Sequence, residues 1–131
     1  VDKKEALMSI PTVARMNAAS CLIFGALFVI ATDSVVRFVG NPPGIVLRIV
    51  GFGLLCNALC LLWSATRSAE RTSLLFFAYG DGAWVAATVG LIATGTWITT
   101  GPGITASLSV AAFVGFVGLL QWRAARRMVT A

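Results

Sequence analysis

One acidic residue lies inside a long apolar stretch of the sequence. The segment FFAYGDGAWVAA, residues 76–87, contains Asp81 with a glycine on either side and no other charged residue. A charge at mid-membrane costs at least about 2.5–3.5 kcal/mol, and acids in such positions usually face a bundle interior and mark proton or ion pathways. Asp81 is therefore the first candidate for a functional residue.

Two asparagines are predicted to lie at nearly the same depth as Asp81. Counted from Ser73 at 1.5 Å per residue, Asp81 lies about 12 Å into its apolar run, and Asn57, counted back from Trp63, lies about 9 Å into its own. Asn17 lies slightly nearer the same end of the bundle. We expect these three side chains to converge and form a ligand or ion site.

The chemistry of Asp81 depends on its neighbours. No Lys or Arg is expected at its depth. The group is then either a carboxylic acid bonded to an amide, or a carboxylate that water or a cation reaches. Two interpretations stay open, because Asp81 could bond Asn57 and merely fix helix packing, or it could serve transport or ligand binding. Trp84, three residues on, should share the face of Asp81 and either shields the acid from lipid or packs the bundle.

Two arginines are weaker candidates. Arg37 and Arg48 lie near the ends of apolar runs, on the side of the bundle opposite to most other basic residues. Arginine there can extend its charged head toward water along its methylene groups. We expect them to be interfacial anchors, with contact to an anion on the outer side as the alternative.

The three cysteines give no strong signal of chemistry. Cys21, Cys56 and Cys60 all fall within apolar runs, and a thiolate site for a soft metal is conceivable there. The chain has no histidine and no CxxC pair, so packing is the favoured role. With no pair of nucleophile and base either, we expect no enzyme activity and no cofactor.

The elements that must position these residues are membrane-spanning helices. Of the 131 residues, 58% are hydrophobic and only 11% are charged, against about 45–50% apolar and about 25% charged in soluble domains. We predict an all-α polytopic membrane protein, a bundle of four transmembrane helices in two helical hairpins, forming a single domain over residues 13–127. The predicted spans, each long enough to cross about 30 Å of hydrocarbon, are residues 13–31, 45–63, 73–94 and 104–122.

The basic residues predict orientation rather than nucleic-acid binding. The net charge is +5, but the Lys and Arg residues lie at the edges of apolar runs and not in a stripe. Eight lie on one side of the predicted bundle and two on the other, which places both termini in the cytoplasm. Residues 1–12 are then a cytoplasmic segment, of which 1–7 either reflect processing or precede a native start at Met8, and residues 123–131 are a basic cytoplasmic tail.

Two sequence patterns concern packing. Residues 42–67 and 101–126 align without a gap at an offset of 59, which suggests a parallel internal repeat. Small residues also recur every four positions, as expected where another helix approaches closely. One such ridge contains Gly82, Ala86, Gly90 and Thr94, and another contains Ser107, Ala111 and Gly115. The sequence leaves open whether the ridges meet within one chain or between copies.

The segments LRIVGFGLLCNALCLLWSATR, YGDGAWVAA and LLQWRAARR together resemble small four-helix proteins of the bacterial inner membrane, over most of residues 13–127. The resemblance implies that fold and that location, and it carries no activity. Two functions follow from the residues. The chain could form an oligomeric channel or transporter for a proton, ion or small solute that uses Asp81, or it could be an accessory subunit that binds a membrane partner through its small-residue faces. Its expected partners are the lipid bilayer and either further copies of itself or another membrane protein, but not nucleic acid.

Overall fold

A computed structural model gives the fold of residues 3–67 and 70–129, with side chains for 11–67 and 70–128. These residues form five helices and no strand. The helices are α1 (Lys3–Ile30), α2 (Thr32–Val39), α3 (Gly44–Ala65), α4 (Arg71–Ala93) and α5 (Gly101–Val129). The predicted all-α class is confirmed.

Four of the helices are long and apolar enough to cross a membrane. The spans are Pro11–Ile30, Gly44–Ala65, Arg71–Ala93 and Gly101–Met128, and 20 helical residues extend about 30 Å. Only 17% to 28% of the most apolar window of each span is buried. Large apolar side chains such as Phe52 therefore point outward. Helices that are apolar on every face fit a multi-pass membrane protein, as the composition predicts.

The helices extend beyond the predicted spans. Helix α1 already begins at Lys3, within the expected N-terminal segment, and α5 continues to Val129, so that residues 123–129 of the expected tail are helical. Lys, Arg, Ala, Glu and Met dominate these extensions and are all good helix formers. The first loop also contains a short helix of its own, α2.

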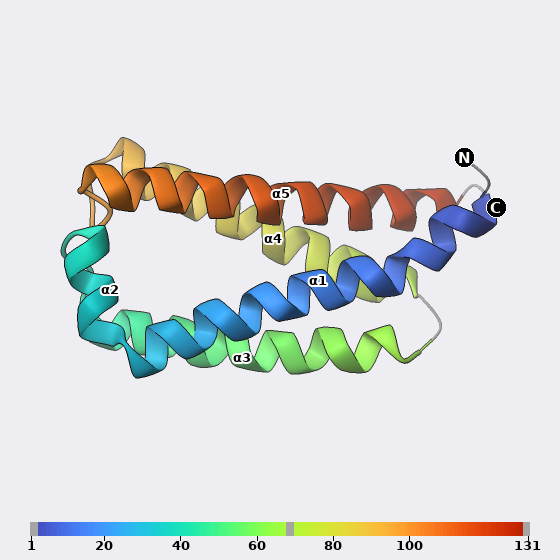
Figure 1. The fold of residues 1–131 in the computed structure, drawn as a ribbon. Coiled ribbons are helices and arrows are strands. Elements are labelled where there is room, and N and C mark those ends of the chain that lie inside the picture. Colours follow the sequence, from blue (N-terminus) through green and yellow to red (C-terminus); the bar gives the residue numbers. More distant parts are fainter. Residues whose placement is uncertain (1–2, 68–69, 130–131) are drawn as a thin grey trace.

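The spans pack mainly as two pairs. Helix α1 lies against α3 and α4 lies against α5, while α1 and α5 join the pairs and α3 makes at most a slight contact with α4 (Figure 1). Two glycines let α1 and α3 approach closely. A Cβ atom built on Gly25 would lie 2.9 Å from the Gly51 carbonyl oxygen, and one on Gly51 would lie 2.9 Å from the Gly25 carbonyl oxygen. Small residues at such crossings are typical of membrane helices.

This crossing gives a prediction for Gly51→Ala. The added methyl group would lie 2.8 Å from Val29 Cγ2 as well as against the α1 backbone. Overpacking of this kind costs about 1–3 kcal/mol and the gain in helix propensity returns up to about 1 kcal/mol. We expect the free energy of unfolding, measured by steric trapping in bicelles, to fall by about 1–2 kcal/mol.

Gly53→Ala is the matched control, two residues along the same helix. A Cβ atom there would meet nothing within 4 Å, so the stability of this variant should be unchanged or slightly higher. Equal losses for the two variants would show that the α1–α3 crossing does not depend on Gly51.

The two ends of the bundle differ. At one end, which we call the terminal end, lie the start of α1, the end of α5, the end of α3 and the start of α4 (Figure 1). At the other, the α2 end, helix α2 crosses the bundle, and its C-terminus is tied to the connection between α4 and α5. Thr99 N–H donates to the Val39 carbonyl at 3.0 Å and Asn41 N–H donates to the Trp97 carbonyl at 3.1 Å. Gly40 has φ +149° and a Cβ atom there would collide with the Trp97 carbonyl, so this close approach requires glycine.

Candidate functional site

Asp81 lies inside the bundle beside Asn17. The Asn17 side-chain amide donates to Asp81 Oδ2 at 3.2 Å and approaches Oδ1 at 3.5 Å. Asn17 is 1% exposed and Asp81 is 7% exposed. This contact joins α1 to α4, and therefore links the two helix pairs through a polar interaction.

Asn57 joins the same group through a cysteine. Its amide lies 3.4 Å from Cys21 Sγ, and Cys21 Sγ lies 3.7 Å from Asn17 Oδ1. A chain of polar contacts thus runs from α3 through α1 to α4. We call Asp81, Asn17, Cys21 and Asn57 the polar cluster. The direct bond between Asn57 and Asp81 that the packing interpretation assumed is not formed, because Cys21 and Asn17 lie between them.

Helix α5 covers the other side of the carboxyl group. A Cβ atom built on Gly118 would lie 2.8 Å from Asp81 Cβ and 3.4 Å from Oδ2. Only a glycine at this position lets α5 lie directly against Asp81. Three helices therefore enclose the carboxyl group: α1 through Asn17, α4 through its own backbone and α5 through Gly118.

Asp81 has no fixed counter-ion among the described side chains. Both of its side-chain hydrogen-bond contacts come from Asn17, and no described Lys or Arg lies within ion-pair distance of it. An amide neutralises no charge. Such a carboxyl group can hold a proton, or it can stay ionised with a cation beside it, and both forms keep the bond from Asn17.

The remaining predicted residues lie outside the polar cluster. Trp84 is partly exposed, and its backbone carbonyl accepts a hydrogen bond from Thr88 Oγ1 at 2.8 Å. Arg37 and Arg48 are exposed, on α2 and in the second turn of α3. The two arginines are thus placed near the α2 end, far along the helices from Asp81.

Only one of the three cysteines lies in the bundle interior. Cys21 is buried in the polar cluster, whereas Cys56 and Cys60 are exposed on α3. Within the described part of the chain, no three metal-ligating side chains come close enough to hold an ion. The structure therefore does not assemble the thiolate site that the spacing left open.

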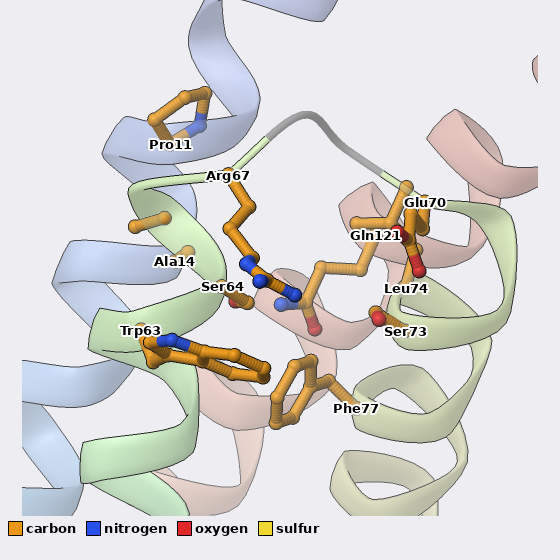
Figure 2. Close-up of a pocket in the computed structure, with 11 residues that line it drawn as sticks. Pro11, Ala14, Trp63, Ser64, Arg67, Glu70, Ser73, Leu74, Phe77 and Gln121 are labelled. Atoms are coloured by element: carbon orange, nitrogen blue, oxygen red, sulfur yellow. The ribbon is translucent and has the colours of Figure 1, made fainter.

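A second polar locus, which the sequence analysis did not identify, lies near the terminal end. Gln121 on α5 is 3% exposed, and its Oε1 atom has no hydrogen-bond partner. It lines a cavity of about 70 Å³ together with residues of α1, α3 and α4 (Figure 2). The sequence does contain an indication of this residue. Gln121 is an amide side chain in an apolar run, next to Trp122, as Asn17 and Asn57 are in theirs.

The cavity has aromatic and charged walls. Trp63 and Phe77 line it, and the Arg67 guanidinium lies 4.2 Å from the centre of the Trp63 ring. The matched positions of the suspected repeat make the same contact, with Arg126 4.9 Å from the centre of the Trp122 ring. Both are cation–π contacts between residues one helical turn apart.

Comparison with known proteins gives no match for this chain. No family model fits it, and no curated protein and no solved structure is significantly similar to it. The function must therefore be argued from the polar cluster and the cavity themselves.

Proposed function

We propose that this protein is a small integral membrane protein that carries a proton, a cation or a small solute across the bilayer, with Asp81 as the residue that binds the transported species. The observation that carries the proposal is the environment of Asp81. It is an acidic side chain, buried, bonded to an amide and without a fixed counter-ion among the described side chains. Ionisable residues inside membranes commonly mark such pathways.

The polar cluster suits a group that changes charge. Asn17 donates to the carboxylate, so the ionised form keeps a partner after a proton or cation leaves. Thr88 is also buried, seven residues after Asp81 on the same face of α4. It supplies a further hydroxyl group toward the α2 end. Binding at Asp81 and passage along this inward face of α4 are the two steps that the proposal requires.

We propose that the protein lies in the bacterial inner membrane with both termini in the cytoplasm. The terminal end of the bundle carries eight basic residues and the α2 end carries only Arg37 and Arg48, which is the bias expected of a cytoplasmic and an outer side. The eight are Lys3, Lys4, Arg15, Arg67, Arg71, Arg123, Arg126 and Arg127. Asp81 would then be reached from the cytoplasm through the terminal end.

The internal repeat is part of the same proposal. Its support is the pairing of α1 with α3 and of α4 with α5, as two consecutive hairpins, together with the matched stacks Trp63–Arg67 and Trp122–Arg126. Parallel repeats about an axis along the membrane normal occur in transporters.

One observation favours the alternative, an accessory subunit or an oligomer that packs through α4. The ridge of Gly82, Ala86, Gly90 and Thr94 is exposed on the outside of the bundle. Cβ atoms built on Gly82 and Gly90 would meet nothing within 4 Å. A groove of small residues that the chain itself leaves uncovered is where a second copy or another membrane helix can approach closely.

Gly90→Leu tests this surface. The side chain fits the monomer because nothing lies near it, but it fills the groove that a second copy would enter. We expect self-association in bilayers, measured by single-molecule photobleaching, to weaken at least about tenfold, or about 1.4 kcal/mol. Gly53→Leu, the same change on an open face of α3, should leave it unchanged. Equal association of wild type and both variants would show that copies do not meet on this ridge.

The experiment that tests the transport proposal is a flux assay on purified protein in liposomes, run separately with protons, monovalent cations and small anions. The proposal expects flux of protons or cations above that of empty liposomes. A protein that folds and inserts but conducts none of the three would favour the accessory role.

A further inference from the structure

The cavity at the terminal end lies one helical turn from the residues around Asp81. On three helices a residue that lines the cavity is paired with a residue at the carboxyl group, and the cavity residue is the one nearer the terminal end. The pairs are Ala14 and Asn17 on α1, Phe77 and Asp81 on α4, and Gln121 and Gly118 on α5. One turn advances about 5 Å along a helix. The cavity therefore ends close to Asp81, on its terminal side.

The mouth of the cavity is polar and open to solvent. Arg67 and Glu70 line it and are both exposed, and Ser73 lies one turn further in on α4 (Figure 2). The cavity has a volume of about 70 Å³, and a water molecule requires about 10–15 Å³ and two or more polar partners. We therefore expect this part of the cavity to hold several water molecules.

The inner end of the cavity is closed by an aromatic ring. Phe77 lines the cavity and yet is only 7% exposed. In Figure 2 its ring lies at the bottom of the view, with Arg67 and Glu70 above it. Phe77 also belongs to a buried apolar cluster with Ala18 and Cys21, and Cys21 is part of the polar cluster. Phe77 is thus shared by the wall of the cavity and the apolar packing around the polar cluster.

The inward face of α4 alternates between polar and apolar groups. From the terminal end it carries Glu70, Ser73, Phe77 and Asp81, and residues three or four positions apart share a face of a helix. The phenyl ring therefore interrupts a polar path to the acid. Hydrophobic constrictions exclude water and act as gates in channels. A proton or cation that moves along this face has to pass the ring.

We propose that the cavity is a water-filled entrance to Asp81 from the terminal end, and that Phe77 is the apolar gate between this water and the carboxyl group. The gate has a role only if Asp81 carries a proton or cation, so it rests on the proposed function. Phe77 controls access and does not bind the transported species. When the ring moves aside, water from the cavity can reach the carboxyl oxygens of Asp81.

Water-edited solid-state NMR of the full chain in lipid bilayers measures this access, because it follows magnetisation from mobile water to the carboxyl carbons of isotope-labelled aspartate. Exposed Asp33 is the internal reference, and the Asp81 signal is identified by its loss in Asp81→Asn. We expect the wild-type Asp81 signal to build up at least about threefold more slowly than that of Asp33. Phe77→Leu keeps an apolar side chain that packed cores tolerate but lacks the outer part of the ring. It should shorten the build-up time of Asp81 at least about twofold.

Phe76→Leu is the matched control. Phe76 is the next residue along α4, it is 68% exposed, and its ring centre lies 5.4 Å from that of Phe77. The same substitution there alters the aromatic pair but leaves the passage closed, so the Asp81 signal should build up as in the wild type. Three results would overturn the gate: equal build-up of Asp81 and Asp33 in the wild type, no gain in Phe77→Leu, or the same gain in Phe76→Leu.

The liposome flux assay on the same variants separates the gate from the transport proposal. Faster build-up at Asp81 in Phe77→Leu, without flux in any sample, would support the gate and contradict transport. Flux in the wild type, without faster build-up in Phe77→Leu, would contradict the gate and leave transport standing.

Discussion

Liposomes that contain the Asp81→Asn variant are expected to lose proton or cation flux by at least about tenfold, equivalent to about 1.4 kcal/mol in the barrier. The amide has the shape of the carboxyl group and can still bond Asn17. It cannot take up or release a proton, and it does not attract a cation. The change therefore removes the chemistry of Asp81 while preserving most of its packing against Gly118, where contacts are close.

The control for this variant is Asp33→Asn. Asp33 is exposed on α2, so the same chemical change there removes one carboxyl group but leaves the polar cluster intact. Its flux should equal that of the wild type. Flux has to be compared at equal amounts of folded protein. If Asp81→Asn retains full flux at equal folding yield, Asp81 is a packing residue and the transport proposal fails.

Asn17→Leu is expected to cause the largest loss of stability among the variants proposed here. It removes the donor to Asp81 and leaves a buried carboxyl group without a partner. Leaving a buried polar group unsatisfied costs about 1–3 kcal/mol, and more when the group is charged. Hydrogen bonds between membrane helices average only about 0.6 kcal/mol. We expect a loss of about 2–3 kcal/mol in steric trapping, because the bond from Asn17 is the contact that holds this acid.

Asn57→Leu, the same substitution at the second asparagine of the polar cluster, serves as the comparison for Asn17→Leu. Asn57 is only partly buried and bonds a sulfur atom, which is a weak acceptor. Asn57→Leu should therefore cost less than about 1 kcal/mol. In an Asp81→Leu background the cost of Asn17→Leu should also fall, since no carboxyl group is left unpaired. A large cost of Asn17→Leu that persists in that background would show that the bond to Asp81 is not its cause.

The sequence predicts much of the fold because hydropathy and length are local properties. The four apolar runs, bounded by Trp63, Trp122 and basic residues, give the four long helices directly. Counting depth along those runs places Asn17 and Asp81 at similar levels, and the structure brings them into contact. This works because the rise per residue of a helix is fixed, so that depth in a membrane can be read from residue numbers.

Which side chains face one another depends on how each helix is rotated about its own axis. The sequence does not specify this rotation when apolar residues surround a helix on every side. Nothing in the spacing shows that Cys21 lies between Asn17 and Asn57, or that Gly118 rather than the ridge of Gly82 faces Asp81. The Gly82 ridge, predicted as a surface for close helix packing, is open in the single chain. Rotation is set by close contacts between small residues such as Gly25 and Gly51, which form only in the folded bundle.

A transport role requires that Asp81 exchange its proton or its counter-ion with the aqueous phase. Infrared difference spectra of the protein in bilayers test this directly, with the spectrum of Asp81→Asn subtracted so that the carboxyl bands of the other acids cancel. Spectra would be recorded over a range of pH and of monovalent cation concentration. We expect the Asp81 carboxyl band to change reversibly with one of these variables. A band that stays the same across both ranges would contradict it, because an acid that never exchanges cannot carry a proton or an ion.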